Sequence, residues 1–228
     1  MKLIITCEHG GNDIPKPYEY LFKKEKHVLK THQGFDLGAL DIFEYLKPLS
    51  VYSKSSKTSR LLIELNRSRY HPKLFSIYTK RLDLEEKGAI ITNYYHPYRN
   101  EVESEIAKLI LNNENVVHLS IHSFTPHLNG IERHCDIGLL YDSRKRSEKE
   151  FSAFLKTQIK TENSGLNVRF NYPYLGKADG FTSYLRQRFT QNYIGIEIEV
   201  NQKFSKSNVM DSILKHTLYS AIQSVIFN

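Results

Sequence analysis

The sequence predicts an α/β fold in three layers, with a mixed, mainly parallel sheet covered by helices on both faces. Short runs rich in β-branched residues alternate along the chain with segments whose apolar residues recur at helical spacing. Such alternation favours parallel strands joined by helices, because the helices then cover both faces of the sheet. The closing segment, residues 209–226, has the strongest amphipathic pattern and predicts a helix that packs on this sheet.

The first part of the chain predicts strands and one helix. Leu3–Cys7 is a β-prone run that stops at Glu8–Asp13, where two glycines and an Asn-Asp pair predict a loop. Asp36–Leu46 has apolar residues at helical spacing and is followed by a proline, which predicts a helix that ends there. Val51-Tyr52 and Leu61–Ile63 are short strand candidates.

The second part of the chain continues the alternation. Between Tyr98 and Asn113 the apolar residues fall on one helical stripe. Val116–Ile121 follows as a β-branched strand, and we expect it to deliver His122-Ser123 into a loop. Further strands are predicted at Ile137–Tyr141 and Tyr193–Val200, and further helices at Ser147–Thr161 and Asp179–Phe189.

Composition limits the class of protein. The chain has 228 residues, of which 40% are hydrophobic, and no linker-like segment divides it, so we expect one domain over residues 1–228. It contains no run of about 18 apolar residues. We therefore expect no membrane partner and a cytoplasmic location. Cys7 and Cys135 lie far apart and outside any metal-ligand spacing, so we expect both to be reduced.

The formal charge of +7 raises the question of nucleic acid binding. The basic residues are interspersed with acids and fall where helix surfaces are expected, so we do not expect nucleic acid as a partner. A basic surface would also steer small acidic substrates toward the protein.

Polar residues gather where three predicted strands end. The loop Glu8–Asp13 follows the first strand, His122-Ser123 follows another, and Glu197 and Glu199 lie on a third. Since side chains alternate along a strand, both glutamates point to one face. Two carboxylates on a half-buried strand are costly unless they face a cleft or a metal. The sequence therefore predicts a functional cleft at the carboxyl edge of the sheet.

His9, His122 and an acidic residue are candidate metal ligands. A hydrolytic zinc site needs about three protein ligands, commonly histidine and carboxylate, and a nearby carboxylate serves as general base. A single histidine after a strand more often satisfies a loop hydrogen bond. Two of them with a glutamate at a third strand favour a metal site, although the residues themselves leave the acidic ligand open.

Several short motifs occur in an order that resembles a known family. They are Cys7–Pro15, Gly34–Ala39, Ser59-Arg60 through Leu65–Ser68, Ile121–Pro126, Arg133 through Asp136–Asp142, and Ile198–Gln202. Over about residues 3 to 202 the chain resembles the N-formylglutamate amidohydrolase family. The resemblance implies the fold of the zinc carboxypeptidases and of the phosphorylase/hydrolase-like and aspartoacylase-like enzymes.

The resemblance also implies site residues. Relatives carry an Asn-Arg pair, a His-Ser after a strand and a late glutamate, which match Asn66-Arg67, His122-Ser123 and Glu199 here. They take two metal ligands from His-x-x-Glu, whereas this chain has His9-x-x-Asn12. We therefore assign the acidic ligand to Asp36, which lies in a family-like motif and equally suits a helix N-cap. Glu8, Asn12 and Asp13 remain the alternatives.

Each candidate side chain has an expected role beside the zinc or other divalent ion. Glu199 is the expected general base, with Glu197 as its substitute. Arg67 and Asn66 suit a substrate carboxylate, because a guanidinium forms two parallel hydrogen bonds with it. Ser123 joins this substrate-binding set. Arg60 and Arg133 either hold a carboxylate or polarise the scissile carbonyl, and Arg133 is our catalytic candidate.

The resemblance implies a metal-dependent amidohydrolase that acts on a small acidic N-acyl amino acid such as N-formylglutamate. Two other functions fit the same residues. One is a zinc peptidase or cell-wall amidase that acts on a peptide. The other is a non-catalytic anion-binding protein of the same fold, which the Asn12 departure keeps open.

Overall fold

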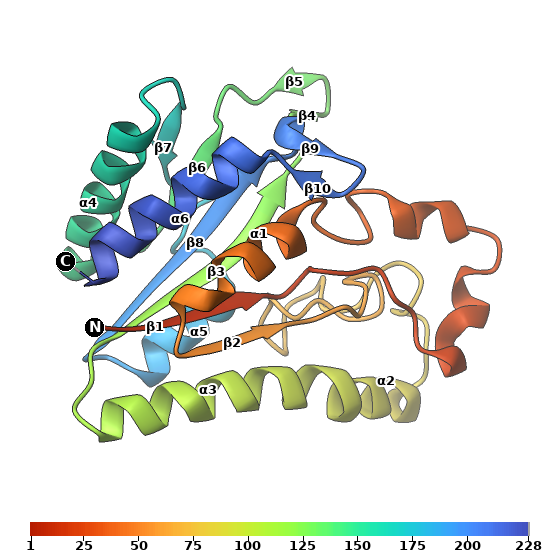
Figure 1. The fold of residues 1–228 in the computed structure, drawn as a ribbon. Helices are drawn as coiled ribbons and strands as arrows, with labels where there is room; N and C mark the ends of the chain where they lie inside the picture. Colours follow the sequence, from red (N-terminus) through yellow and green to blue (C-terminus); the bar gives the residue numbers. More distant parts are fainter. Residues whose placement is uncertain (228) are drawn as a thin grey trace.

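The computed structural model describes residues 1–227 and is built around a six-stranded sheet in the order β2-β1-β3-β8-β6-β7 (Figure 1). Its strands are β1 (Lys2–Cys7), β2 (Tyr52–Ser55), β3 (Val116–Phe124), β6 (Ile137–Leu140), β7 (Val168–Phe170) and β8 (Tyr193–Asn201). The first four strands of this order are parallel, while β6 runs antiparallel to β8 and parallel to β7. The predicted mixed, mainly parallel sheet is confirmed.

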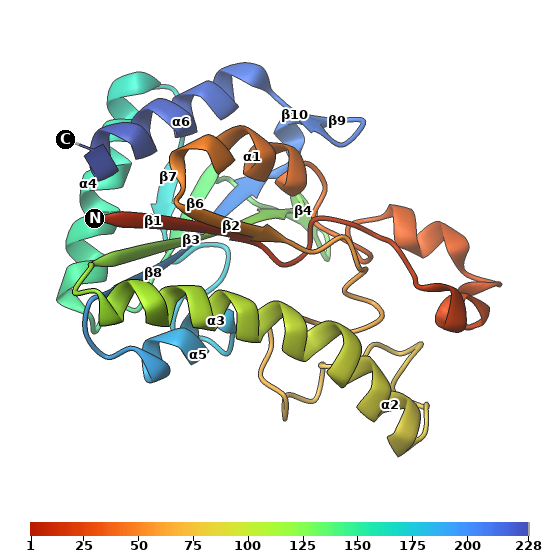
Figure 2. The same ribbon diagram turned by 60° about the horizontal axis from the view of Figure 1, so that its bottom comes forward.

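Helices cover both faces of the sheet, as predicted (Figures 1 and 2). One layer contains α1 (Ala39–Leu46), α4 (Arg146–Glu162) and α6 (Ser212–Phe227), and the other contains α3 (His96–Leu111) and α5 (Phe181–Arg188). A π-helical turn at Ile91–Tyr95 joins α2 (Leu84–Ile90) to α3, so that one long helix extends past the sheet (Figure 2). Two hairpins, β4 (His127–Leu128) with β5 (Ile131–Glu132) and β9 (Ser205–Lys206) with β10 (Val209–Met210), complete the described elements together with four short 3-10 segments.

Alternation along the strands divides the core into two halves. Toward the α1, α4 and α6 layer, every second strand residue is apolar: Leu3, Ile5, Cys7, Val117, Leu119, Ile121, Ile196, Ile198 and Val200. On the opposite face the strands begin with apolar residues such as Ile4 and Val116 and become polar toward their carboxyl ends. The polar residues are Thr6, Glu8, His118, Ser120, His122, Glu197 and Glu199, all buried. This face therefore presents its chemistry at the edge where the parallel strands end.

Some predicted boundaries were wrong. Leu61–Ile63 is a turn and not a strand, although Leu62 and Ile63 are fully buried. The Leu61 carbonyl accepts a hydrogen bond from the Ser76 hydroxyl at 2.5 Å instead of from a neighbouring strand. An apolar run indicates burial, and it becomes a strand only where another strand pairs with it.

Three further boundaries differ for local reasons. Strand β3 continues to Phe124, so His122 and Ser123 lie in the strand rather than in a loop, paired with β8. The last helix begins at Ser212, because Val209–Met210 pairs with β9. The N-cap of α1 is Gly38, which leaves the Asp36 carboxylate free of a capping role. None of the helices in residues 1–227 is both long and apolar enough to cross a membrane.

Candidate active site

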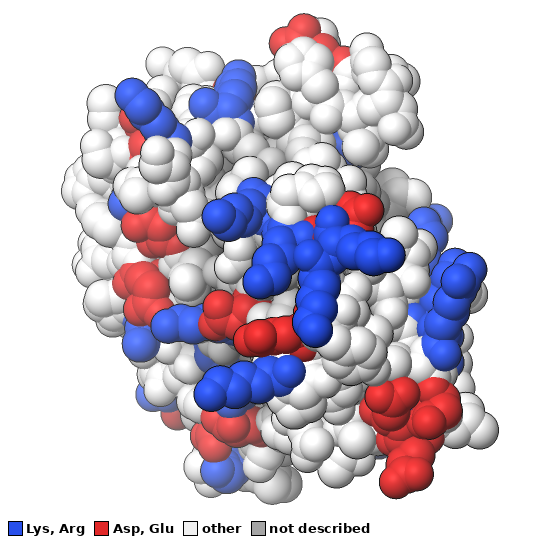
Figure 3. All heavy atoms as spheres, turned by 90° about the vertical axis from the view of Figure 1, so that its right-hand side faces the viewer, with Lys and Arg blue, Asp and Glu red and all other residues white. Residues whose placement is uncertain are grey.

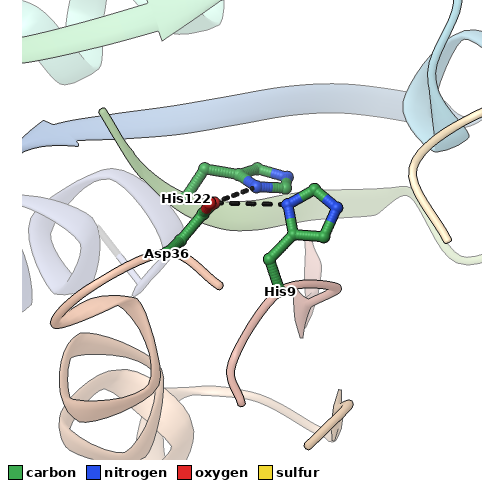
Figure 4. A group of neighbouring side chains, drawn as sticks. All are labelled: His9, Asp36 and His122. Carbon is green, nitrogen blue, oxygen red and sulfur yellow. Dashed lines mark hydrogen bonds and ion pairs between the residues drawn. The ribbon is translucent and has the colours of Figure 1, made fainter. Parts of the chain in front are cut away.

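His9, Asp36 and His122 meet at the carboxyl edge of the sheet (Figure 4). The Asp36 Oδ2 atom lies 3.3 Å from His9 Nδ1 and 2.9 Å from His122 Nδ1. The centroids of the two imidazole rings are 5.0 Å apart, and all three residues are buried. Three residues from distant parts of the chain therefore point their polar atoms at one location.

Three backbone segments position this cluster. His9 follows β1, His122 lies near the end of β3, and Asp36 lies in the loop before α1. The loop is tied to the end of β1 because the Asp36 backbone N–H donates to the His9 carbonyl at 2.9 Å. The same loop is held from the other side, where the Ser59 hydroxyl donates to the Gly34 carbonyl at 2.8 Å.

Each histidine has its second ring nitrogen on another carboxylate. His9 Nε2 is hydrogen-bonded to Glu64 Oε1. His122 Nε2 lies 3.2 Å from Glu8 Oε2 and 2.8 Å from the Ser120 hydroxyl. Carboxylates in this position fix the ring orientation of metal-binding histidines and raise their basicity. The sequence reasoning considered Glu8 only as a ligand and missed Glu64, which directly precedes the Leu65-Asn66-Arg67 motif and could have been found from that position.

Burial and charge balance each other in the cluster. Burial by itself raises the pKa of Glu64 and of Glu8. Arg60 and His9 outweigh this effect for Glu64, and His122 outweighs it for Glu8. The pKa values of both carboxyl groups are therefore lowered. For His122, burial has the opposite sign and lowers the pKa, but the hydrogen bonds to Asp36 and Glu8 raise that pKa well above the usual value. The carboxylates are therefore ionised and suited to stabilise positive charge.

The donor set fits a divalent transition metal. Two imidazoles and one carboxylate form a common catalytic zinc set, and their ligand atoms all lie within 4.8 Å of one another. Ligands of a tetrahedral zinc ion are about 3.3 Å apart, since each bond is about 2.0 Å, and the two contacts of Asp36 are close to this spacing. Asn12 instead donates to the Leu29 carbonyl at 2.9 Å, and the ligand group found among residues 1–227 consists of His9, Asp36 and His122 without Asp13.

Glu199 lies beside His122, because the two residues are register partners on neighbouring strands. Its side chain is 5% exposed, and within residues 1–227 its Oε2 atom has no hydrogen-bond partner. Burial raises the pKa of Glu199 to about 7, with Asp36 adding to the effect and His122 opposing it. Glu197 shares this face and accepts a hydrogen bond from the Thr182 hydroxyl at 2.6 Å.

Two of the predicted arginines have different surroundings. Arg60 donates to Glu64 Oε2 from Nε at 2.9 Å and to Asp36 Oδ1 from Nη1 at 3.2 Å. Its guanidinium is therefore already paired with two carboxylates. Arg67 is half-buried and donates from Nη1 to the Asp179 carbonyl. Asn66 accepts the Phe181 backbone N–H at 2.7 Å, and its amide nitrogen lies 3.4 Å from His122 Nε2.

Ser123 borders the His-Asp-His cluster, because its backbone N–H donates to Asp36 Oδ2 at 3.4 Å. The Ser123 hydroxyl donates to the Leu37 carbonyl at 2.7 Å and accepts from Gln202 Nε2 at 3.0 Å, so protein groups occupy it. Arg133 is outside the residues that line the pocket, and its Nη1 atom donates to the Tyr174 hydroxyl at 3.3 Å.

A pocket of about 320 Å³ opens over the cluster. It is lined by His9, Asp36, Arg60, Asn66, Arg67, His122, Ser123, Tyr174, Leu175, Ala178, Asp179, Glu197 and Glu199. This volume suits a small molecule. Seen from the carboxyl edge of the sheet, Lys and Arg side chains gather over the middle of the face, with acidic side chains among them (Figure 3). The segment 171–180 supplies four of these lining residues, and none of the four was among the site residues predicted from the sequence.

Comparison with known proteins gives the family. The family model for N-formylglutamate amidohydrolase matches residues 1–205. The chain belongs to the N-formylglutamate amidohydrolase family. This family hydrolyses amide bonds, so membership makes the chain an amidohydrolase and confirms the resemblance predicted from its motifs.

Two solved structures are similar over nearly the whole chain. Gene product Atu2144 from Agrobacterium tumefaciens is 26% identical, with a TM-score of 0.81 over 98% of this chain and 91% of that chain. N-formylglutamate amidohydrolase from Ralstonia eutropha JMP134 is 16% identical, with a TM-score of 0.71 over 99% of this chain and 93% of that chain. No curated protein matches the chain. The amidohydrolase family fold therefore extends across both sheet faces and all three segments that form the His-Asp-His cluster.

Proposed function

We propose that this amidohydrolase is metal-dependent and cleaves a small N-acyl amino acid, with N-formylglutamate as the leading substrate candidate. One observation carries the proposal: a buried carboxylate without a hydrogen-bond partner on one oxygen, that of Glu199, lies beside a His-Asp-His cluster. A divalent ion, with zinc as our candidate, held by His9, Asp36 and His122 would supply Lewis-acid chemistry to a carbonyl in the pocket.

Glu199 is the proposed general base. A carboxyl group whose pKa is close to 7 can take a proton from water and return it at the same pH. We assign it both steps: it removes a proton from the water that attacks the amide carbon, and it then protonates the leaving amine. Glu197 holds the Thr182 hydroxyl and therefore suits the base role less well.

Arg67 and Asn66 are the proposed anchor for the substrate carboxylate. Arg67 lines the pocket, and within residues 1–227 its guanidinium donates one hydrogen bond, to a backbone carbonyl, which leaves further N–H groups for an anion. Arg60 is occupied by Glu64 and Asp36, so we assign it to neutralising these carboxylates. The pocket volume supports a small substrate over a long peptide. The name of the Ralstonia eutropha relative agrees with a formyl amino acid.

The test is Glu199→Gln, measured with a panel of N-formyl and N-acyl amino acids and with metal analysis of each preparation. We expect metal content to stay unchanged and kcat to fall by about 100-fold to 10,000-fold, the usual contribution of a general base. The matched variant Glu197→Gln should lose much less. His122→Ala should lose both metal and activity. Full activity in Glu199→Gln would refute the base assignment.

The same preparations separate catalysis from simple anion binding. If the wild-type protein holds less than about 0.1 metal equivalent and gains no activity with added Zn²⁺, Mn²⁺ or Co²⁺, the metal-dependent mechanism is wrong. Anion binding without turnover would then be the remaining function for this pocket.

A further inference from the structure

Arg133 is a buried cation whose charge no acidic side chain of residues 1–227 neutralises. It lies just before β6 with 9% of its surface exposed. Its guanidinium carbon is 5.4 Å from the centroid of the Tyr174 ring and 5.8 Å from that of Phe124. Its only side-chain hydrogen bond in residues 1–227 goes to the neutral Tyr174 hydroxyl, and no carboxylate of these residues is within ion-pair distance.

The other buried arginine environments differ from this one. Arg186 is paired with the buried Glu148 at 2.8 Å and also donates to two backbone carbonyls. Arg60, which is half-buried, is paired with Glu64 and Asp36. Arg99 has no carboxylate, but it donates to the carbonyls of Leu65 and Arg67 and stacks on three rings. Arg133 therefore stands out, since among the described residues only one of its five guanidinium N–H groups meets a protein acceptor.

A buried charge without a partner costs free energy, and an anion that reaches it removes this cost. Tyr174 connects Arg133 to the pocket, because its side chain lines the pocket and is 47% exposed. The Tyr174 hydroxyl oxygen accepts the Arg133 N–H, so its own O–H group is free to donate to a ligand. The arginine thus favours negative charge at the place where the tyrosine meets the pocket.

The segment that carries Tyr174 is held in place from both ends. The Asn171 side-chain oxygen accepts the backbone N–H groups of Tyr141 at 3.1 Å and Gly176 at 3.0 Å. The Gly176 carbonyl accepts Arg186 Nη1 at 2.6 Å. A side chain supported in this way offers its hydroxyl without much ordering cost when a ligand binds.

We infer that Tyr174 and Arg133 form a subsite for a second carboxylate, that of the side chain of an N-acyl dicarboxylic amino acid. The inference rests on the proposed function, in which Arg67 holds the first carboxylate. Glu197 and Glu199 occupy the β8 wall of the pocket and would repel a carboxylate there. The structure thus assigns Arg133 to substrate selection and not to polarising the scissile carbonyl.

The test compares N-formyl-L-glutamate with N-formyl-L-glutamine, which has the same shape and a neutral side chain. We expect wild type to prefer the glutamate substrate in kcat/KM. Arg133→Met should lower kcat/KM for glutamate by about tenfold, because the buried positive charge acts on the substrate carboxylate through the Tyr174 hydroxyl. It should change the glutamine value less than about threefold. Arg133→Lys should restore part of the preference, and Tyr174→Phe should lose part of it.

Arg169→Met is the matched control, because Arg169 also stacks on a tyrosine, 4.2 Å from the Tyr172 ring centroid, but lies outside the pocket. It should leave both substrates unchanged. An unchanged substrate preference in Arg133→Met, or an equal loss of both substrates, overturns the subsite.

Calorimetric titration with L-glutamate and L-glutamine, the products of these substrates, gives a readout that is independent of turnover. If Arg133→Met binds L-glutamate more weakly than wild type does but binds L-glutamine equally well, the subsite is supported. This holds even if neither formyl substrate is cleaved, since a lack of cleavage would contradict only the proposed function. Equal binding of both amino acids by wild type and by the variant counts against the subsite.

Discussion

The two histidines of the cluster depend on carboxylates that lie behind them. Glu64 bonds to His9 Nε2, accepts the Asn66 backbone N–H at 3.0 Å and accepts the Arg60 guanidinium. One side chain thus connects a metal-binding candidate with the segment that carries Asn66 and Arg67. Because Glu64 lies two residues before Asn66, the same carboxylate can both bond to His9 and hold the Asn66 backbone.

Glu64→Gln should weaken metal binding, because the amide cannot carry the negative charge that makes His9 more basic. Loss of such a partner typically costs 10-fold to 100-fold in metal affinity. Competition with a chromogenic chelator measures the dissociation constant for Zn²⁺. Glu162→Gln, at an exposed position on α4, is the control and should bind as wild type does. Equal Zn²⁺ affinity in Glu64→Gln and wild type would show that Glu64 does not support the site.

At the scale of elements, the long helix formed by α2, the π-helical turn and α3 supports the substrate-binding segment. Tyr95, the last residue of the turn, donates from its hydroxyl to the Arg67 carbonyl at 2.8 Å. Arg99, one helical turn later, donates to the carbonyls of Leu65 at 2.9 Å and Arg67 at 3.1 Å. The Arg99 guanidinium packs on Phe181, with 4.4 Å to the ring centroid. Two side chains of one helix therefore hold the backbone on both sides of Asn66.

Tyr95→Phe and Arg99→Lys should raise KM more than they lower kcat, because they loosen Arg67 without touching the His-Asp-His cluster. We expect KM to rise up to about tenfold, equivalent to about 1.4 kcal/mol, with metal content unchanged. Steady-state kinetics on the best substrate measures this split. Tyr94→Phe in the same π-helical turn is the control for the Tyr95 variant. A loss confined to kcat would assign these residues to catalysis instead.

At the scale of the whole molecule, one face of the sheet carries buried ionisable groups that link stability to pH. His118 lies between β1 and the start of β8, with Thr6 Oγ1 at 2.7 Å and the Tyr193 hydroxyl at 2.8 Å from its two nitrogens. Burial lowers the pKa of His118 to about 4, against a weaker opposing effect of Glu8. The histidine is therefore neutral in the folded protein near pH 7.

Stability should fall as the pH falls from about 6.5 to 4, because the unfolded chain then binds a proton at His118 that the folded chain does not. The contribution is fully present above pH 6.5 and amounts to about 2 kcal/mol lost by pH 5. Urea unfolding of metal-free protein at pH 7 and pH 5 measures it, and His118→Gln should remove it. His9 and His122 have raised pKa values, so their contribution to stability changes with pH in the opposite direction. Both histidines are present in wild type and in His118→Gln, so their contribution cancels in the comparison. Equal pH dependence in wild type and variant would contradict the assignment.

The sequence predicted several residues of the site, although each of them taken alone was weak evidence for a site. His9, His122 and Glu199 could be chosen because they lie where strands end, and Asp36 because of a family-like motif. Glu64 could have been noticed beside the Asn66-Arg67 motif, and Arg133 was already a candidate, but their contacts could not be predicted in this way. Their roles depend on which groups surround them, and neither periodicity nor spacing reveals that one arginine meets two carboxylates while another meets none.

What the sequence determined by itself was most of the strands and helices in order, although not β7 (Val168–Phe170) or α2 (Leu84–Ile90), and the face to which each predicted strand residue points, because both follow from local periodicity. Only the tertiary structure decided that Leu61–Ile63 forms a buried turn, that β6 runs against β8, and that the Asp36 carboxylate meets two histidines rather than a helix end. Those outcomes depend on pairing and contacts between residues far apart in the chain, whose free energies no local pattern contains.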